Sequence, residues 1–275
     1  FWHLTQSTKR EGYENSDHYK LSERFEIETA KNSDYVFAIT NAVKEVLVEN
    51  GVEEEKIFIL PNAVDSEKFK FLEPDESLKR ELGIEDKTVI GYVGSFIEYE
   101  GLDLLLEACA MLKERHGDVF KLLLVGDGDT MQLLRRTSRF LQLEDMVIFT
   151  GRVPHDEVQR YYSLIDIAPL PRKGLRVCEL VSPLKPFEAM GAGKVLVTSS
   201  VRALEEIVQD GVTGLVFEKD NAADLAEKLE LVLLDSALRK KIGANANKWV
   251  QENHSWNVIS ERVTDIYKQI WEEQQ

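Results

Sequence analysis

The sequence contains only two cysteines, Cys109 and Cys178, which lie far apart with no Cys-x-x-Cys or Cys/His spacing. This scarcity excludes a disulfide framework and gives no zinc-binding pattern, so both are expected to be ordinary core thiols. The acidic pair Asp127 and Asp129 has no third carboxylate at a suitable spacing. We therefore expect no bound metal.

Positive charge is also scarce: 34 basic residues stand against 49 acidic ones, for a net charge of −15. Such a surface repels a phosphate backbone, so a nucleic-acid partner is not expected. A phosphate group could still bind where backbone N–H groups and one lysine make the field locally positive.

Long apolar runs and a signal peptide are absent, since no stretch approaches the ~20 residues of a membrane span. We expect a cytoplasmic protein, and peripheral association with the inner face of a membrane stays open. The sequence opens on Phe1-Trp2-His3 without a methionine, and no strand with a Gly-rich turn precedes residue 30. It is expected to start within a longer protein.

Alternating strand and helix patterns run through the whole chain. Up to residue 65 the patterns predict a loop, a helix, a strand, a helix and a strand, at Thr5–Asp17, Tyr19–Lys31, Asp34–Ile39, Ala42–Glu49 and Ile57–Leu60. After a charged segment, Glu67–Lys87, apolar strands are predicted at Thr88–Val93, Lys121–Val125, Met146–Phe149, Ile165–Leu170, Lys194–Thr198 and Gly214–Phe217. Amphipathic helices between such strands indicate a doubly wound α/β fold with a buried parallel sheet.

Turn chemistry at Pro61–Asp65 marks a domain boundary. We predict a first domain at 1–65, a second at 66–255 and a C-terminal helix at 256–275. That helix either crosses back to the first domain or caps its own sheet.

Loops at the carboxyl edge of a parallel sheet are the first place to look for a ligand site. Gly94 after the first apolar strand permits a tight turn, and Val125–Asp129 is a plain turn with Asp129 as an N-cap. The loop Arg172–Lys194 is the richest: Ser-Pro-Leu-Lys185 opens a helix, an arrangement that attracts a diphosphate. Glu188, one turn on, can accept hydrogen bonds from both hydroxyls of a ribose.

Five segments in this order resemble the retaining family-four glycosyltransferases of the two-Rossmann-domain (GT-B) architecture, over residue 30 to the end. They are Pro61-Asn62-Ala63-Val64-Asp65, Gly91-Tyr92-Val93-Gly94-Ser95, Val125-Gly126-Asp127-Gly128, Gly151-Arg152-Val153-Pro154-His155 and Lys185-Pro186-Phe187-Glu188-Ala189-Met190-Gly191. The resemblance implies that the second domain holds a nucleotide-diphosphate sugar of UDP or GDP type, that the first holds the acceptor, and that no metal or other cofactor is required.

By the same resemblance, Glu188 binds the donor ribose, and Arg152 and Val153 lie along the base. The loop with Ser182, Leu184 and Lys185 faces the sugar and phosphates. Gly94 and Ser95 belong to the donor-binding turn. Lys185 and Glu179 are the predicted catalytic residues, although eight residues separate Glu179 from Glu188 where the family has seven.

Two positions depart from the family, which usually has an arginine and a lysine where this chain has Ser95 and Glu100. We expect Lys185, with Arg172, to replace the lost positive charge.

The predicted activity is transfer of the sugar, with retention, to a glycan, a lipid-linked sugar or another hydroxyl acceptor, in assembly of a bacterial cell-surface or exported polysaccharide. The alternatives are a nucleotide-sugar epimerase, a non-catalytic nucleotide-sugar-binding module and a pyridoxal phosphorylase. Because early residues of the acceptor domain are absent, the isolated chain is expected to lack full activity.

Overall fold

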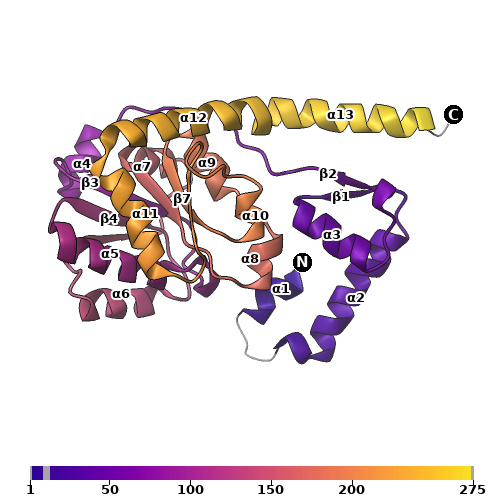
Figure 1. Ribbon diagram of the computed structural model, residues 1–275, viewed down its shortest axis with the longest axis horizontal. Helices are drawn as coiled ribbons and strands as arrows, with labels where there is room; N and C mark the ends of the chain where they lie inside the picture. Colours follow the sequence, from indigo (N-terminus) through magenta and orange to yellow (C-terminus); the bar gives the residue numbers. More distant parts are fainter. Residues whose placement is uncertain (1, 9–12, 274–275) are drawn as a thin grey trace.

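The computed structural model describes residues 2–8 and 13–273 of the chain. Its centre is a parallel sheet of six strands in the order β5-β4-β3-β6-β7-β8 (Figure 1). The strands are β3 (Thr88–Val93), β4 (Phe120–Val125), β5 (Val147–Gly151), β6 (Ile167–Leu170), β7 (Val195–Ser199) and β8 (Leu215–Phe217). Strand order reverses between β3 and β6, which is the switch point of a doubly wound, Rossmann-like α/β fold. The predicted fold class is confirmed.

Helices cover this sheet because its central strands are apolar on both faces: every residue of β6 and β7 is buried. Helix α11 packs on α5, and α12 packs on α9 and β7. The helices are α4 (Glu76–Leu82), α5 (Leu102–His116), α6 (Met131–Phe140), α7 (Val158–Leu164), α8 (Arg176–Leu180), α9 (Lys185–Gly191), α10 (Arg202–Glu205), α11 (Ala222–Leu234) and α12 (Ser236–His254), with a 3-10 turn, η3, at Glu98–Glu100.

A smaller part precedes the large sheet and holds two parallel strands, β1 (Val36–Ala38) and β2 (Ile57–Ile59). Its other elements are α1 (Trp2–Ser7), η1 (Tyr13–Asn15), α2 (Asp17–Lys31), α3 (Asn41–Glu49) and η2 (Glu54–Lys56). Ser16 caps α2 and Thr40 caps α3, each accepting a backbone N–H three residues on.

One sequence prediction was wrong. The segment Thr5–Asp17 was expected to be a loop, but Thr5 to Ser7 complete α1, whose Leu4 is buried. The charged segment Glu67–Lys87, for which no element was predicted, contains α4, which a single buried residue, Leu78, anchors to the core.

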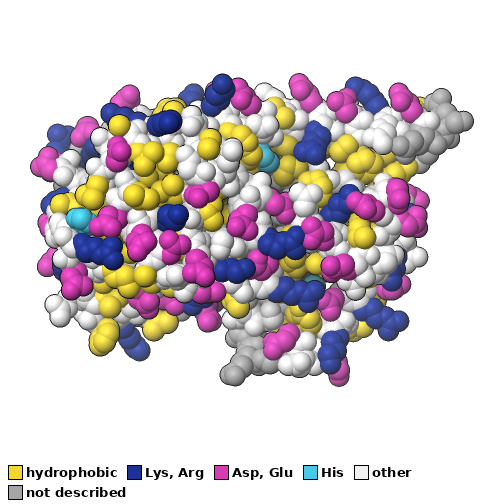
Figure 2. All heavy atoms as spheres, in the orientation of Figure 1, with side chains coloured by type: hydrophobic (Ala, Val, Ile, Leu, Met, Phe, Trp, Pro, Cys, Tyr) yellow, Lys and Arg dark blue, Asp and Glu magenta, His cyan; other side chains and the backbone are white. Residues whose placement is uncertain are grey.

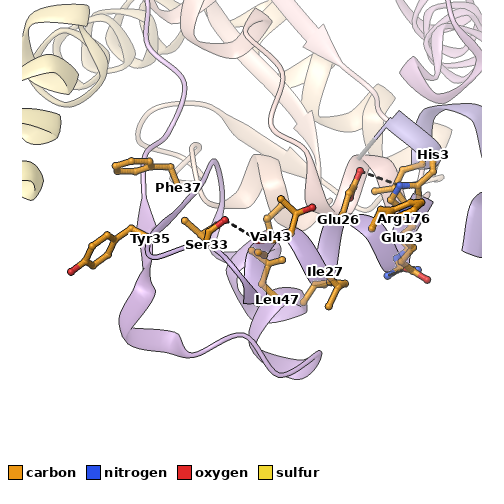
Figure 3. Close-up of a pocket in the computed structure, with 16 residues that line it drawn as sticks. His3, Glu23, Glu26, Ile27, Ser33, Tyr35, Phe37, Val43, Leu47 and Arg176 are labelled. Atoms are coloured by element: carbon orange, nitrogen blue, oxygen red, sulfur yellow. Dashed lines mark hydrogen bonds and ion pairs between the residues drawn. The ribbon is translucent and has the colours of Figure 1, made fainter. Parts of the chain in front are cut away.

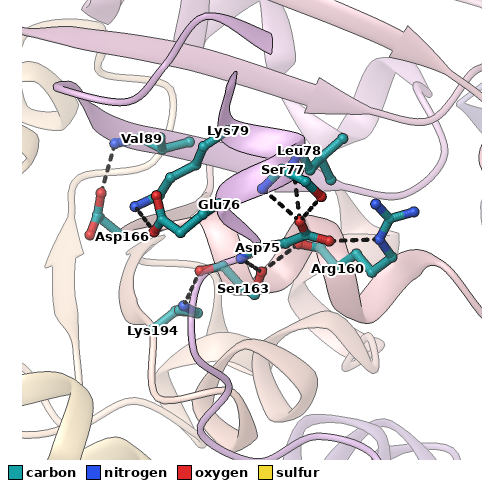
Figure 4. A network of polar contacts seen from close by, with 10 residues as sticks. All are labelled: Asp75, Glu76, Ser77, Leu78, Lys79, Val89, Arg160, Ser163, Asp166 and Lys194. Carbon is teal, nitrogen blue, oxygen red and sulfur yellow. Dashed lines mark hydrogen bonds and ion pairs between the residues drawn. The ribbon is translucent and has the colours of Figure 1, made fainter. Parts of the chain in front are cut away.

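A network of polar contacts holds α4 in place (Figure 4). The Asp75 carboxylate accepts the backbone N–H groups of Ser77 and Leu78 and pairs with Arg160 Nε at 2.8 Å. The backbone N–H of Asp75 donates to Ser163 Oγ, and Lys194 Nζ donates to the Ser163 carbonyl. These contacts tie the cap of α4 to α7 and to the start of β7.

The chain passes between the two parts at two adjacent places. Val64 N donates to His254 O and Trp256 N donates to Val64 O, so Val64 and Ser255 form a parallel bridge. Helix α13 (Trp256–Glu273) starts there and runs over β1 and β2 (Figure 1), where the rings of Tyr267 and Phe37 lie 6.2 Å apart.

The surface carries acidic and basic side chains side by side (Figure 2). Over residues 2–8 and 13–273, every helix is too short or too polar to cross a lipid bilayer.

Candidate functional site

The switch point brings together the turn after β3 and the loop after β6. Gly94 has φ +148°, and a Cβ built on it would lie 2.3 Å from Lys185 Cε. The Lys185 chain therefore passes directly over Gly94, in space that only a glycine leaves free. Ser95 is exposed beside it.

A buried carboxylate shares this crevice. Glu100, 3% exposed, places Oε1 2.9 Å from Lys185 Nζ and 3.8 Å from Arg172 Nε. Arg172 is also buried, and its Nη1 donates to the Val181 carbonyl at 2.7 Å. The structure thus gathers Lys185 and Arg172 at one point, where Glu100 offsets one of the two positive charges, and their role in replacing the lost donor-binding charge stays a prediction.

Glu188 lies one turn beyond Lys185 on α9. Burial raises the pKa of its carboxyl, while the Tyr162 hydroxyl, which donates to Glu188 Oε2 at 3.1 Å, and the charge of Lys185 act in the opposite direction. Lys68 and His155, whose Nζ and Nε2 lie 2.7 Å apart, add a weaker favourable field. This carboxylate is oriented by one donor and keeps capacity to accept others.

The loop before α9 is fixed from the smaller part. Asn62 Nδ2 donates to the carbonyl of buried Ser182 at 2.9 Å, and His254 Nδ1 lies 3.1 Å from the Asn62 carbonyl. Leu184 is half exposed at the N-cap of α9. The motif around Asn62 therefore positions the predicted donor loop.

Arg152 and Val153 follow β5 at the same sheet edge. Gly151 turns the chain with φ +74°, after which Arg152 is exposed and Val153 packs against the core. Their predicted contact with a base stays a prediction.

Glu179 lies apart from this cluster. Its carboxylate accepts the Arg202 backbone N–H at 2.9 Å and pairs with Lys219 Nζ at 2.6 Å. These two hydrogen bonds tie Glu179 to α10 and to the loop after β8, and its catalytic role stays a prediction.

Sequence reasoning missed the roles of four neighbours, Tyr162, Lys68, His155 and Glu100. Tyr162 lies on a short amphipathic helix with no motif to mark it. Lys68 and His155 are distant in sequence and meet only in the fold. Glu100 had a usable signal, because an acid where a base is expected, together with a new lysine elsewhere, indicates a charge pair.

Hollows also lie away from the switch point, two of them in or beside the smaller part. One hollow, of about 240 Å³, lies between the two parts. Its lining includes Thr40, Asn41, Pro61, Ser182 and Glu206. Another, of about 550 Å³, lies in the smaller part between α2, β1 and α3 (Figure 3). It is mainly apolar, with a His3–Glu26 pair at its edge.

Among the described residues, no group of three or more His, Cys, Asp or Glu side chains is arranged to hold a metal ion.

Comparison with protein families gives two adjacent matches. The model described as "Glycosyl transferases group 1" matches residues 74–249, well over half of the chain, and the one described as "Glycosyltransferase Family 4" matches residues 1–68.

Curated relatives are longer than this chain. An uncharacterised glycosyltransferase of Methanocaldococcus jannaschii is 28% identical over 92% of the chain and 64% of its own length. The capsular polysaccharide biosynthesis glycosyltransferase CapM of Staphylococcus aureus is 25% identical over 84% of the chain and 60% of its own length.

Solved structures share the fold. Anabaena HepE in complex with UDP-glucose superposes with a TM-score of 0.81 at 20% identity, covering 93% of this chain and 69% of that one. Sucrose-phosphate synthase of Thermosynechococcus elongatus gives 0.79 at 23% identity, covering 98% and 66%. With the architecture and the matched models agreeing, the chain belongs to the group 1 glycosyl transferase family.

Proposed function

We propose that the crevice at the switch point binds a nucleoside-diphosphate sugar and that the protein transfers this sugar, with retention, to a hydroxyl acceptor. One observation carries the proposal: Lys185 over Gly94 and Glu188 beside Tyr162 stand one turn apart on α9, at the sheet edge where ligands bind in this fold. A cation and an acceptor-only carboxylate at that spacing suit a diphosphate and a ribose.

In this proposal Glu188 accepts the ribose hydroxyls, while Arg152 and Val153 lie along the base. Gly94 and Ser95 border the phosphates, and the loop with Ser182 and Leu184 faces the sugar. Lys185 stabilises the departing diphosphate as negative charge builds on it, which is where preorganised charge lowers a barrier most. The acceptor hydroxyl attacks from the same face, and its proton passes to the departing phosphate. No metal or separate cofactor takes part.

The names of relatives support a UDP or GDP donor and a glycan product. HepE was solved with UDP-glucose, CapM is a capsular polysaccharide enzyme, and a Mycobacterium tuberculosis relative, 25% identical, is a GDP-mannose-dependent mannosyltransferase acting on a phosphatidylinositol monomannoside. We propose a glycan or lipid-linked sugar as acceptor, at the inner face of a membrane.

The test is a calorimetric titration of the chain with UDP, GDP and ADP without added metal. We expect selective binding of one nucleotide and at least tenfold weaker binding by Glu188→Ala, since hydrogen bonds to a charged group contribute about 1.5–3 kcal/mol. Glu107→Ala, at an exposed glutamate of α5, is the matched control. Equal affinities for Glu188→Ala and the wild type would refute the ribose contact.

A second candidate is a nucleotide-sugar-binding module without turnover, which the Glu100 ion pair favours because it occupies Lys185. Tight donor binding with no transfer to any acceptor would select it. A nucleotide-sugar epimerase would instead convert or release the sugar from the donor alone.

A further inference from the structure

Glu100 is an unusual component of this crevice. It ends η3 immediately before Gly101, and its carboxylate lies near the Lys185 ammonium, the Arg172 guanidinium and the Tyr92 hydroxyl. Within the described residues, its second oxygen, Oε2, is buried without a hydrogen-bond partner. The Glu100 carboxylate therefore lies within one ion-pair distance of the ammonium group that would hold an anionic ligand.

The charge of the cluster is therefore small. Lys185, Arg172 and Glu100 together carry one net positive charge, although two cations converge on the crevice. Since burial limits screening by water and salt, the negative charge of Glu100 is felt by a bound anion.

The two nucleotides of the proposed reaction differ in charge at the atoms nearest Lys185. In a sugar nucleotide each phosphate of the diphosphate carries a single negative charge. In the released nucleoside diphosphate the terminal phosphate has a second ionisation, with a pKa near 6 for a phosphate monoester, so it carries one more charge at pH 8.

We propose that Glu100 is a specificity-determining residue that disfavours the released nucleoside diphosphate relative to the sugar donor. The inference rests on the donor site proposed above. With a phosphate oxygen and the Glu100 carboxylate on opposite sides of the Lys185 ammonium, the two anions lie about 6 Å apart, two hydrogen-bond lengths. At that separation in a partly buried site, repulsion from Glu100 weakens the affinity for the bound anion. Each negative charge on the anion changes that affinity by a factor on the order of ten to a hundred. The extra charge of the product is penalised most, which favours its release after transfer.

The test compares UDP with UDP-glucose by calorimetric titration at pH 8, or the matching GDP pair if the chain selects GDP. Glu100→Gln removes the charge and keeps the shape. We expect Glu100→Gln to increase the affinity for UDP at least tenfold more than the affinity for UDP-glucose. Glu100→Asp keeps the charge and should keep the wild-type ratio of these two affinities. The control is Asp103→Asn, which removes a carboxylate of α5 that pairs with Lys173. It should leave the ratio of the UDP and UDP-glucose affinities unchanged.

A second variant leaves the buried cluster intact. Ser95→Lys adds a positive charge at an exposed position beside Gly94 and is expected to shift the ratio in the same direction. Equal shifts for both ligands, or loss of UDP binding in Glu100→Gln with the fold intact, would overturn the proposal while the donor site stands. If neither ligand binds to the wild type or to any variant, the donor site fails, and the proposal fails with it.

Discussion

The Tyr162 hydroxyl donates a 3.1 Å hydrogen bond to Glu188 Oε2, so α7 orients the carboxylate that α9 presents at the switch point. Burial is the largest influence on this pair and raises the pKa of Glu188 and, well above 10, that of Tyr162. Burying the Glu188 carboxylate costs folding free energy, so its presence here indicates a function other than stability.

Glu188→Gln is expected to stabilise the fold at pH 7 by about 1 kcal/mol, because it removes a charge that burial disfavours. The folded pKa is raised, so the stability due to the neutral carboxyl is present at low pH and is lost as the pH rises through that pKa. The difference between variant and wild type should therefore vanish toward pH 4. Denaturant unfolding at several pH values measures this difference in the free energy of unfolding, and Glu107→Gln is the control. A difference that stays constant with pH would contradict the raised pKa of Glu188.

Lys194 provides a second titration, of opposite sign. Burial lowers its pKa to about 8, with Asp166 partly compensating (Figure 4). Below pH 8 the charged form costs stability relative to the unfolded chain, and this cost is relieved as the pH rises from 8 toward the ordinary value. Lys194→Met should stabilise the protein by about 1–3 kcal/mol at pH 7 and much less at pH 10. A variant less stable than the wild type at pH 7 would show that the bond to Ser163 dominates.

Gly101 and Gly83 form a matched pair for backbone sterics, because both are in the left-handed region, with φ/ψ of +71°/27° and +66°/41°. A Cβ on Gly101 would lie 1.8 Å from the Pro171 carbonyl oxygen, whereas one on Gly83 meets nothing within 4 Å. Gly83→Ala should cost only the left-handed conformation, about 1 kcal/mol, and Gly101→Ala several kcal/mol more. If urea unfolding shows the same loss of stability for both variants, the loop after β6 can move away from the added methyl group at little cost.

Both cysteines should resist a thiol reagent until the protein unfolds. Cys109 and Cys178 are buried, and burial raises the pKa of the Cys178 thiol to about 12 and that of Cys109 higher still. Only the thiolate form of cysteine reacts with a disulfide reagent. At pH 8 the native protein should therefore release essentially no chromophore from the reagent, and the guanidinium-denatured protein should release two equivalents per chain. Rapid reaction of one thiol in the native state would indicate local opening near Tyr99, whose carbonyl contacts Cys178.

The sequence predicted the sheet well because strands such as Lys121–Val125 and Ile165–Leu170 are apolar on both faces, a pattern that only a covered parallel sheet explains. It missed α4, where stability comes from an Asp75 cap and one buried leucine instead of an amphipathic stripe. It also missed α1, a helix of six residues that packs on α2, η1 and α8 and buries Leu4.

Of the candidate site, the sequence located Gly94 in a turn and Lys185 and Glu188 at the start of a helix, all at one sheet edge. The Glu100–Lys185 pair was missed: an acid where the family has a base was a signal, but the contact itself depends on how η3 and α9, 85 positions apart in the chain, pack together. The hydrogen bond from Tyr162 was unpredictable for the same reason.

The bridge between Val64 and Ser255 has a mechanical consequence. Two crossings of the chain that lie side by side and share backbone hydrogen bonds act as a single pivot, so the two parts can turn about one line but cannot slide apart. Contacts near a pivot move least: the Asn62–Ser182 hydrogen bond, two residues from Val64, should persist through such a rotation. The Glu23–Arg176 ion pair joins α2 to α8, which lie farther from the two crossings in Figure 1, so a rotation should stretch it more than the Asn62–Ser182 hydrogen bond.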